Sequence, residues 1–597
     1  MQEADILIGI YRERGTQGMP LERVYRQLFN PELYLRSYGK IYSNSGALTK
    51  GATGETADGM SLERIHAIID ALRHERYEWT PVRRINIPKK AGGTRPLGLP
   101  TWSDKLLQDV VRSLLEAYYE PQFRDSSHGF RAQRGCHTAL FRVKQWKACR
   151  WFIEGDISKC FDKIDHSVLL KILGERIQDN RLLRLVANML KAGYLEDWKW
   201  NRTLSGTPQG GVISPLLSNI YLDQLDRYVE DVLIPQYTRG KIRARNSDYR
   251  HYEYLSRVAR KAGDREGWRA ARQAMRLLPC GDQSDPEFRR LTYVRYADDF
   301  LLGFIGPKVE ADEIKAKIAC FLQGQLQLEL SQAKTLVTHA KTESARFLGH
   351  EIKVSHCATK VAGSQRTRSV NGKIALLVPA DVQRAKVQRF MKAGKVIHRP
   401  ELLSDDDLSI ISLYQSEWRG LVNYYLMAHN VSKRLSKVRR AMEISLCKTL
   451  AAKHQMTLSQ VFRKYRSEAI TVHGPLKTIG AIQPRPDKRP LVAVFGGIPL
   501  RKQDRPFGLS DSATSPSWNR RSELVKRLVA DHCELCGSTN QVEVHHIRKL
   551  SDLNQPGRRV KAPWKEVMIA RRRKTLVVCR ACHLQIDNGQ YDRSSIH

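Results

Sequence analysis

Three aspartates that follow apolar runs are the residues of this sequence best suited to metal chemistry. Asp298 and Asp299 lie in "YVRYADDF" (293–300), and Asp156 ends the apolar run "RWFIEGD" (150–156). Two such acidic ends side by side could hold two Mg²⁺ ions, one activating a 3′-hydroxyl and one stabilising a pyrophosphate leaving group. Mg²⁺ prefers hard oxygen ligands and keeps part of its shell for substrate phosphates, so a few carboxylates suffice. On its own, the Asp298-Asp299 pair could equally form a polar hairpin turn.

Two glycine-containing turns favour a phosphoryl-transfer site over a simple turn. Lys89 and Arg95 lie on either side of a Gly-Gly turn, where a hairpin could fold over a triphosphate and Arg could bind it in a bidentate manner. "GTPQGG" (206–211) begins an apolar helix, and its glycines permit close approach of the backbone to nucleic acid. Taken singly, the two cations are surface charges in a basic chain and the glycine-rich turn is weak evidence.

Four cysteines near the C-terminus indicate a second, chemically different site. They form two C-x-x-C pairs, Cys533 with Cys536 and Cys579 with Cys582, a pattern typical of a structural tetrahedral zinc site. The other cysteines are scattered, which is typical of an intracellular protein and not of a disulfide framework. The segment "VEVHHIRKL" (542–550) lies between the pairs, and a histidine follows the last cysteine.

The charge of the chain indicates a nucleic-acid partner. Its 597 residues include 100 Lys and Arg against 62 Asp and Glu, a net charge of +38. Each phosphate that a cation neutralises releases counterions, which drives binding. An anionic membrane surface is less favoured, because the basic residues are spread along the chain and no apolar run reaches transmembrane length. The start "MQEADILIGIYRERG" lacks a signal-peptide core and is untypical of a transit peptide.

The elements that must position these residues follow from periodicity and turn signals. Residues 1–80 are expected to be largely helical, and 230–290 are expected to be a solvated, partly helical basic insertion. Residues 474–520, rich in Pro, Gly, Arg and Lys, indicate a linker or a small irregular basic module. The remaining predictions are helices at 61–73, 103–119, within 205–229, at 407–430 and at 432–455, a hairpin at 81–100, and strands at 150–157, 291–295 and 300–305.

The order of the motifs resembles that of reverse transcriptases, and more narrowly that of proteins encoded by group II introns. The successive blocks are "RRINIPKKAGGTRPLGLPTWSDKLLQ", "SSHGFRAQRGCHTAL", "GDISKCFDKIDH", "GTPQGGVISPLLSNIYLDQLD", "YVRYADDFLLG", "LELSQAKTLVTH" and "RFLGHEI". The resemblance covers essentially the whole chain. It implies an α+β fold, in which a right-hand polymerase of fingers and palm is followed by a helical thumb or maturase domain and a C-terminal zinc-stapled ββα-metal (HNH) domain.

The resemblance also implies roles for individual residues of the polymerase. Asp156, Asp298 and Asp299 would bind the two catalytic Mg²⁺ ions, with Asp298 as the main ligand. The "FLG" turn at 347–349 matches the primer grip. The positions implied to bind substrate or template are Lys89 and Arg95 (the dNTP triphosphate), Phe161 (a gate against a ribose 2′-hydroxyl), Gln209 (near the templating base pair) and Lys334 (the family's motif lysine). Without the family, Phe161 would be interpreted as core.

The C-terminal segment resembles an HNH nuclease. By that resemblance His546 is the general base, His545 and His583 are ligands of the nuclease metal, and the four cysteines hold a structural zinc ion. Two positions depart from the family pattern, since Asp587 stands where a histidine is usual and Thr575 where the middle asparagine is usual. Aspartate is itself a ligand of hard metals, so we expect Asp587 to complete a working site with altered metal preference. The alternative is a decayed nuclease that only binds DNA.

The implied domains follow the same order. They are an N-terminal template- or RNA-binding extension (1–80), fingers and palm (81–370, with the 230–290 insertion), a thumb or maturase domain, also called domain X (380–472), a basic DNA-binding region or linker (474–525) and an HNH endonuclease (526–597). In the thumb, Trp418 and Val422 are expected to be core, while the basic helix at 432–455 is expected to contact RNA phosphates.

The function implied is that of a multifunctional intron protein. It would bind its group II intron RNA and assist splicing, nick target DNA, and extend the freed 3′-hydroxyl with dNTPs by reverse transcription of the intron, which is retrohoming. The implied location is the bacterial cytoplasm, where the protein would associate with the nucleoid or with a ribonucleoprotein, and an organelle is the alternative. The resemblance is compatible with a homodimer. It implies no membrane partner. The rival functions are an RNA-binding splicing factor with relic catalytic domains, which intact aspartates disfavour, and a reverse transcriptase of another bacterial retroelement, which the thumb and nuclease motifs disfavour.

Overall fold

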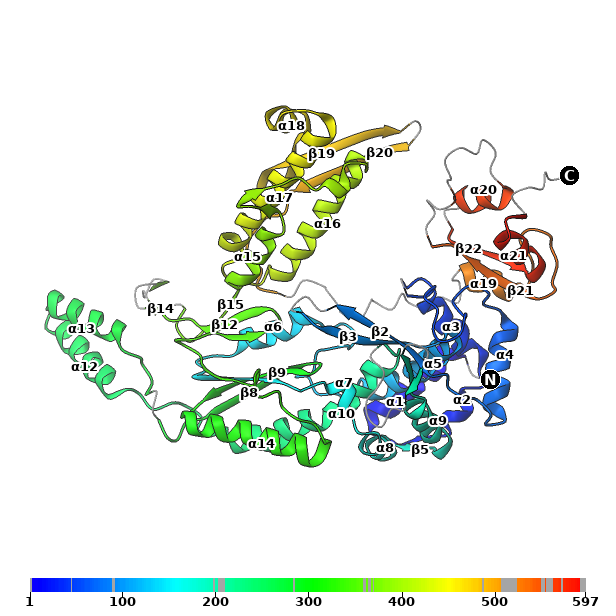
Figure 1. The fold of residues 1–597 in the computed structure, drawn as a ribbon. Helices are drawn as coiled ribbons and strands as arrows, with labels where there is room; N and C mark the ends of the chain where they lie inside the picture. The colour runs from blue at the N-terminus through cyan, green and yellow to red at the C-terminus, as the bar shows by residue number, and fades with distance from the viewer. Residues whose placement is uncertain are drawn as a thin grey trace.

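The described chain consists of a large mixed α/β unit, a helical unit above it and a small domain at one side (Figure 1). The computed structural model describes residues 3–44, 46–88, 92–196, 199–201, 210–282, 285–357, 361–362, 367–368, 370–485, 488–505, 523–548, 553, 562–570 and 573–590. Among these residues, no helix is both long enough and apolar enough to cross a membrane.

The centre of the large unit is an antiparallel sheet of four strands in the order β10-β4-β9-β8. Neighbouring residues of a strand point to opposite faces, so Ile153 joins the core that contains helix α14, while Phe152 joins the core that contains helix α6. Because both faces of the sheet are covered, β9 is a nearly continuous apolar run after Asp299, and its residues are buried on both faces. The bounds are β4 (Trp151–Asp156), β8 (Arg290–Tyr296), β9 (Asp299–Ile305), β10 (Val337–His339), α6 (Cys136–Gln145) and α14 (Lys308–Leu326).

The N-terminal helices and a second sheet lie beside this centre. The hairpin of β2 (Val82–Pro88) and β3 (Thr94–Leu99) extends through β6 (Tyr194–Glu196) to β7 (Lys199–Asn201). Ser61 caps α4 by accepting from the Arg64 N–H at 3.2 Å, and Thr101 caps α5 in the same way through Asp104. The helices are α1 (Ala4–Gln17), α2 (Val24–Gln27), α3 (Pro31–Ile41), α4 (Leu62–Arg73), α5 (Trp102–Tyr119), α7 (Cys160–Lys163), α8 (His166–Gly174), α9 (Asn180–Lys191) and α10 (Ser214–Arg227). The helices predicted at 61–73 and 103–119 and the hairpin predicted at 81–100 are confirmed.

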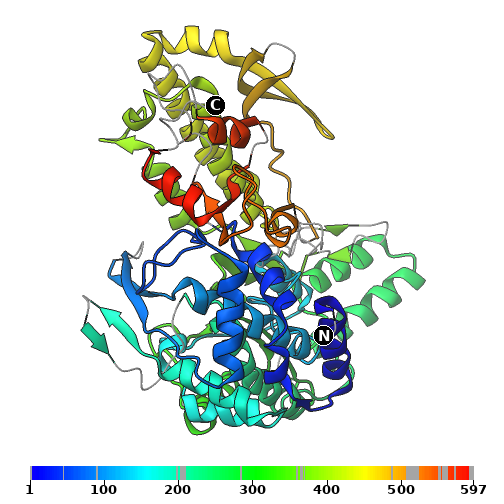
Figure 2. The ribbon, with the colours of Figure 1, turned by 90° about the vertical axis from the view of Figure 1, so that its right-hand side faces the viewer.

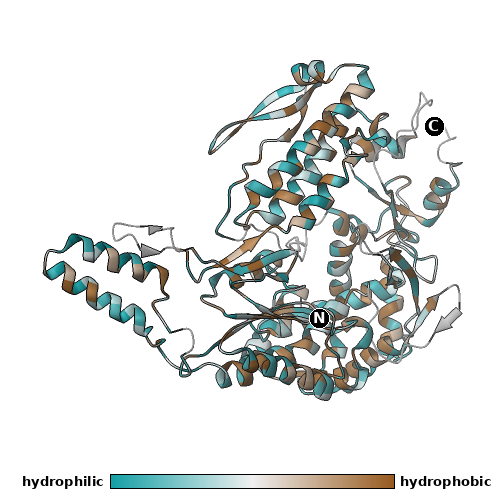
Figure 3. Cartoon of the chain, turned by 60° about the vertical axis from the view of Figure 1, so that its left-hand side comes forward, coloured by the Kyte–Doolittle hydropathy of each residue, from teal (hydrophilic) through white to brown (hydrophobic). Residues whose placement is uncertain are grey.

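The insertion after α10 is a helical hairpin that projects from the large unit (Figure 1). It follows a π-helix (Tyr228–Leu233) and α11 (Ile234–Gln236), and is built from α12 (Ser247–Lys261) and α13 (Arg265–Leu277). Its two helices contain one buried residue each, Ala259 and Ala271. Figure 3 shows hydrophobic as well as hydrophilic colours along this hairpin, and its exposed large hydrophobic residues include Val258 and Leu277. The expected solvated, partly helical insertion is therefore present.

The helical unit above the large one has a core of its own. Trp418 and Val422 of α16 are fully buried in it, as expected from the sequence. The predicted helices at 407–430 and 432–455 correspond to α16 (Asp407–Tyr425) and α17 (Val431–His454). Residues of α15 (Ala380–Gln388) and α18 (Leu458–Tyr465) also pack into this core. The other elements from residue 345 to residue 465 are β11 (Ala345–Phe347), β12 (His350–Val354), β13 (Val361–Ala362), β14 (Thr367–Arg368), β15 (Ile374–Leu377), β16 (Met391–Lys392), β17 (Lys395–Val396) and a 3₁₀ helix (Pro400–Leu402).

The structure differs from the sequence prediction after residue 474. Strands β19 (Gly474–Arg485) and β20 (Lys488–Gly496) form a long hairpin, to which β18 (Arg466–Thr471) adds a third strand. The expectation of an irregular linker is therefore wrong for this part of 474–520. Ala493 and Phe495 alternate with the exposed or half-exposed residues that precede them, and they join the core of α16. One buried face therefore stabilises the hairpin. In the sequence, the many Pro, Gly and basic residues obscure this alternation.

The small C-terminal domain lies directly on the N-terminal helices (Figure 2). It contains α19 (Glu523–Val529), β21 (Val542–His546), α20 (Pro563–Ala570), β22 (Thr575–Cys579) and α21 (Arg580–Asp587), and β21 pairs with β22 in antiparallel register. The Gly59 N–H donates to the Val544 carbonyl and the Val544 N–H donates to the Met60 carbonyl, both at 2.9 Å. Val544 and Val577 belong to the same core as Met60, so the two ends of the chain share one hydrophobic interior.

A buried ion pair joins the central sheet to the helix beside it. Arg295 of β8 and Asp226 of α10 have no exposed side-chain surface, and their two hydrogen bonds measure 2.7 and 2.6 Å. The same guanidinium donates to the Ala297 carbonyl and the Ser127 hydroxyl, both at 2.8 Å. The Tyr293 hydroxyl also donates to Asp226.

We expect Asp226→Ala to lower the free energy of unfolding by about 3–5 kcal/mol, because Arg295 would stay buried without its counter-charge. The matched control is Asp381→Ala, since the pair of Asp381 with Arg346 is half exposed; its loss should cost less than about 1 kcal/mol. Urea denaturation followed by tryptophan fluorescence measures both. Equal shifts for the two variants would contradict the role given to the buried pair.

Candidate active sites

The three aspartates of the central sheet meet at one end of β4 and β9. Asp156 is the last residue of β4 and Asp299 the first of β9, and the two are directly paired in register. Asp298 occupies the turn between β8 and β9, beside Ala297, whose φ of +54° is in the left-handed region. The structure thus brings together the three residues that the sequence predicted as one site, and it makes Asp299 the start of a strand instead of part of the turn.

Two glycines permit this close assembly. A Cβ on Gly129 would lie 2.5 Å from the backbone nitrogen of Ala297, so the segment before α6 can press against the acidic turn only through glycine. A Cβ on Gly155 would lie 2.0 Å from the Phe300 ring, which covers the strand just before Asp156. Close packing around the carboxylates therefore explains why the blocks "SSHGF" and "FIEGD" contain glycine at these positions.

The carboxylates lie in a strongly negative, half-buried environment. Burial, Asp298 and Asp156 together raise the pKa of Asp299 to about 7. Burial also raises the pKa of Asp298, and Asp156 adds to the effect. Carboxylates that repel one another in this way are stabilised by a divalent cation, and their oxygens are the ligands that Mg²⁺ prefers. The donor set therefore fits the Mg²⁺ ions that the sequence predicted.

Lys334 is the cation that the structure places against this cluster. Its Nζ donates to both oxygens of Asp156, at 3.1 and 3.0 Å, and this hydrogen bond is the main reason that its pKa is raised. The Ser331 N–H donates to the Asp156 carbonyl at 2.8 Å, which aligns the segment carrying Lys334 with the end of β4. Lys334 remains two-thirds exposed, so its ammonium group is accessible from solvent.

The predicted substrate-binding residues are only partly within the described chain. Arg95, exposed on β3, is close enough for its charge to lower the pKa of Asp298. Phe161, on α7, contacts Phe130 edge-on with ring centroids 6.2 Å apart. Phe130 in turn lines a cavity of about 600 Å³, together with Lys40 and other residues of the N-terminal helices and β3. Lys89 and Gln209 lie outside the described residues.

The predicted primer-grip turn is bound by the helical unit. Leu348 and Gly349 both have positive φ, and their carbonyls accept hydrogen bonds from the hydroxyls of Tyr424 (2.9 Å) and Tyr425 (3.1 Å) of α16. The two tyrosines of α16 therefore fix the turn that follows β11.

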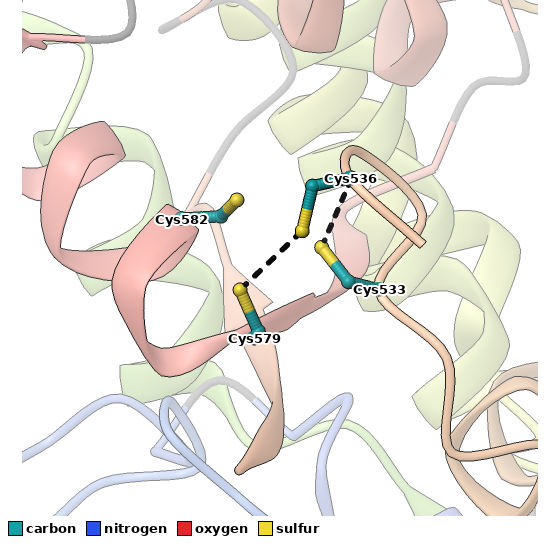
Figure 4. Close-up of side chains that lie close together, drawn as sticks. All are labelled: Cys533, Cys536, Cys579 and Cys582. Carbon is teal, nitrogen blue, oxygen red and sulfur yellow. Dashed lines mark hydrogen bonds between the residues drawn. The ribbon is translucent and has the colours of Figure 1, made fainter. Parts of the chain in front are cut away.

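The four cysteines of the small domain converge on one point (Figure 4). Their sulfur atoms all lie within 4.8 Å of one another, and the Sγ atoms of Cys536 and Cys579 are 3.7 Å apart. Four ligands about 2.3 Å from one zinc ion would be separated by about 3.8 Å. Burial would raise the pKa of Cys533, but backbone N–H groups, among them that of Cys536, hold it at about 7. The cluster has the donors and geometry of a tetrahedral S₄ zinc site.

The nuclease residues predicted from the sequence gather beside the cysteines. His545 Nδ1 lies 3.7 Å from Asp587 Oδ1, and His583 Nε2 lies 3.7 Å from Asp587 Oδ2. The carboxylate of Asp58, which was not predicted from the sequence, completes this group from the N-terminal region. No local signal marks Asp58, since it lies in a loop rich in Gly, Thr and Ser. Glu543 was also missed; its Oε1 lies 2.7 Å from His583 Nδ1.

His546 is placed differently from its neighbour. Its Nε2 is 2.9 Å from the hydroxyl of Tyr38, and burial lowers its pKa to about 4. A neutral imidazole is the form that a general base needs. Thr575, which stands in the usual asparagine position, is paired with His546 in register and accepts from Arg527 at 3.0 Å, so it fixes the strand that carries the histidine.

Comparisons with known proteins identify the families of the domains in which the two sites lie. Three families match in order: "Reverse transcriptase (RNA-dependent DNA polymerase)" over 87–352, "Type II intron maturase" over 373–481 and "AI2M/AI1M-like, HNH endonuclease" over 533–583. The chain is 38% identical over 594 residues to the group II intron-encoded protein LtrA of Lactococcus lactis, covering 94% of this chain and 95% of the relative. It is 34% identical to an uncharacterized 91 kDa protein in the cob intron of Schizosaccharomyces pombe, covering 96% of this chain and 71% of the relative.

The raised pKa of Asp299 predicts a pH-dependent stability in buffer without divalent cations. The folded state holds this proton up to about pH 7, whereas the ordinary pKa is 3.8. Stability is therefore lost as the pH rises from about 4 to 7, and the loss is complete above that range. Asp299→Asn should flatten this part of a plot of melting temperature against pH, and Mg²⁺ should do the same to the wild type. The exposed residue Asp312 provides the control, and Asp312→Asn should keep the wild-type slope; an unchanged slope in Asp299→Asn would contradict the assignment.

Proposed function

The chain belongs to the group II intron-encoded proteins, and from this premise we propose which of its residues carry each activity. It is an RNA-directed DNA polymerase and an intron maturase with an HNH endonuclease domain. These activities fit retrohoming, in which a nick in target DNA supplies the primer for reverse transcription of the intron. The observation that carries the polymerase assignment is the register that pairs Asp156 with Asp299 next to Asp298.

In the polymerase, Asp156, Asp298 and Asp299 would hold two Mg²⁺ ions, which supply a Lewis acid for the 3′-hydroxyl and for the leaving pyrophosphate. Asp298, in the turn, would be the main ligand, and Asp299, at the start of β9, the supporting one. Lys334 would offer its ammonium to the triphosphate once Asp156 is engaged by a metal ion. Arg95, which already lies in the electrostatic range of Asp298, binds the triphosphate from the fingers.

Selection of deoxyribonucleotides is proposed for Phe161. Phe161 lies on α7, shortly after the end of β4, and its ring packs edge-on against Phe130, which would hold it in place beside a bound sugar. A bulky ring there would collide with a 2′-hydroxyl. Lys89 and Gln209 retain the roles implied by the sequence, in triphosphate binding and near the templating base pair.

RNA binding is proposed for the basic surfaces outside the catalytic site. Lys433, Lys437 and Arg440 are exposed along α17, while the apolar residues of that helix are buried in the unit's core. The N-terminal extension and the insertion of α12 and α13 add further cations. Phosphate contacts of this kind position an RNA without reading its sequence, so the identity of the intron would come from its shape. The likeness to a bacterial relative supports a cytoplasmic ribonucleoprotein as the form of the protein.

DNA nicking is proposed for the small domain. The four cysteines would bind a structural zinc ion, and His545, His583 and Asp587 would bind the nuclease's divalent cation, which polarises the scissile phosphate. His546 accepts the proton of the attacking water, since it is neutral and its Nε2 can exchange the Tyr38 hydroxyl for water. The cleavage frees a 3′-hydroxyl, which is the group that the polymerase extends.

Asp298→Ala should reduce cDNA synthesis on the order of a thousandfold, because metal stabilisation worth several kcal/mol is lost. Splicing of the intron RNA should continue at the wild-type rate, since the RNA-binding surfaces are unchanged. Primer extension and a splicing assay measure the two activities separately. Asp312→Ala, on the exposed side of α14, is the matched control. Undiminished cDNA synthesis in Asp298→Ala would favour the rival function, a splicing factor with relic catalytic domains.

His546→Ala should slow nicking of target DNA by about 10²–10⁴-fold through loss of the general base. Extension of a pre-annealed DNA primer should be unaffected, which would also show that the variant is folded. His66, exposed on α4, gives the control variant His66→Ala. If His546→Ala nicks at the wild-type rate, the nuclease uses another base or the domain only binds DNA.

A further inference from the structure

We propose that Asp58, from the N-terminal extension of the polymerase, is the fourth ligand of the nuclease's divalent cation, and that this ligation keeps the nuclease closed while it is docked. The inference rests on the proposed function of His545, His583 and Asp587 as ligands of that cation. It adds to that site a metal ligand from the opposite end of the chain. It also explains why the nuclease would stay inactive until DNA reaches it.

The distances around Asp58 suit ligands of one cation better than hydrogen bonds. Asp58 Oδ1 is 3.4 Å from His583 Nε2 and 3.8 Å from His545 Nδ1. The two contacts of Asp587 with these nitrogens each measure 3.7 Å. Direct hydrogen bonds fall at about 2.7–3.2 Å. Four atoms placed about 2.0–2.2 Å from one metal in tetrahedral geometry lie about 3.3–3.6 Å apart, and the four ligand atoms here are all within 4.8 Å of one another.

The histidine nitrogens that face this centre lack other partners. Among the described residues, neither ring nitrogen of His545 nor Nε2 of His583 makes a hydrogen bond of ordinary geometry, although the two side chains are only 8% and 5% exposed; their charged neighbours are the carboxylates of Asp58 and Asp587 at 3.4 to 3.8 Å. Leaving a buried polar atom unpaired costs about 1–3 kcal/mol, which a bound cation would offset. The second nitrogen of His583 is engaged by Glu543 at 2.7 Å, the carboxylate contact that typically orients a metal-binding histidine.

Docking of the nuclease on the polymerase is what delivers Asp58. The bridge between Met60 and Val544 aligns the loop with the strand that carries both histidines. The His546 N–H donates to Asp58 Oδ1 at 2.7 Å, so the carboxylate is fixed by the main chain of the nuclease as well. Separation of the two parts would withdraw one ligand from the cation. Metal binding and docking therefore strengthen each other by the same free energy.

The docked nuclease has no place for DNA at its reacting atoms. The Nε2 of His546, the proposed general base, is engaged by the Tyr38 hydroxyl at 2.9 Å, and the ring of Tyr42 lies 5.9 Å from its own. Asp58 would take one coordination position of the cation that must also bind the scissile phosphate. In this closed state a DNA phosphodiester has to displace Asp58 from the metal and Tyr38 from His546, so the contacts that dock the nuclease also keep it inactive.

The test compares Asp58→Asn with Asp70→Asn in the full-length protein. Asp58→Asn is nearly isosteric and can still accept the His546 N–H, whereas Asp70 is an exposed residue of α4. Both are made in an Asp298→Ala background, so that Mn²⁺ binding measured by calorimetry reports the nuclease site. We expect Asp58→Asn to weaken Mn²⁺ binding at least about tenfold and to speed hydrogen exchange at the Gly59 and Val544 amides. At saturating Mn²⁺, its DNA nicking should rise several-fold, while Asp70→Asn behaves as its parent.

A second pair of variants separates closure from metal ligation. Tyr38→Phe removes the hydroxyl that engages His546, and should raise nicking without changing Mn²⁺ affinity; Tyr42→Phe is its control, since only the ring of Tyr42 is near. Unchanged Mn²⁺ affinity in Asp58→Asn, together with its loss in His583→Ala, would overturn the inference and leave the proposed nuclease site intact. Unchanged affinity in His583→Ala would overturn the proposed site itself. Unchanged nicking in both Asp58→Asn and Tyr38→Phe would overturn the closure.

Discussion

The buried guanidinium of Arg295 is the constraint on which the catalytic arrangement depends. A charge without solvent must be fully paired, and here the pairing draws Asp226 of α10, the Ser127 hydroxyl and the Ala297 carbonyl to one point in the interior. Ala297 is the first residue of the turn that carries Asp298. This buried ion pair therefore fixes the position of the aspartates proposed to bind metal, without itself contacting metal or substrate. It also stabilises a turn in which a residue other than glycine has a positive φ.

The aspartates oppose the charge of the rest of the molecule. A chain with a net charge of +38 attracts phosphates over its whole surface, yet the reacting phosphates must come to a point where carboxylates crowd together and their pKa values rise. Divalent cations resolve this conflict, because they neutralise the aspartates and bind phosphate oxygens at once. Lys334, which lies between the two kinds of charge, is suited to the exchange from carboxylate to triphosphate.

The nuclease depends on the polymerase for its stability as well as for Asp58. Its described residues form a sheet of two strands, and a domain of this size usually needs a metal or a partner surface to supplement its core. The cysteine cluster provides the first on one side of the sheet. The other side, with Val544 and Val577, is continuous with the core of the N-terminal helices. Docking and metal binding therefore act on the same small domain from opposite faces.

The sequence by itself determined the chemistry of this protein and most of its elements. Asp156, Asp298 and Asp299, the four cysteines and the trio His545, His583 and Asp587 could be predicted because motifs are local patterns of residue type and spacing, and the helices at 61–73 and 103–119 follow from local periodicity and caps. The hairpin of β19 and β20 was not predicted, because its strands are stabilised by one face that is buried on α16 and not by a local sequence pattern. Lys89 and Gln209 remain sequence predictions.

Only the tertiary structure identified Asp58 and Tyr38 at the nuclease and gave Arg295 its counter-charge in Asp226. The partners in each of these contacts are far apart along the chain, and nothing in the local sequence of either partner encodes the other. Their meeting is decided by how the sheets and helices pack, because packing alone brings distant side chains within the few ångströms over which hydrogen bonds, ion pairs and metal ligation act.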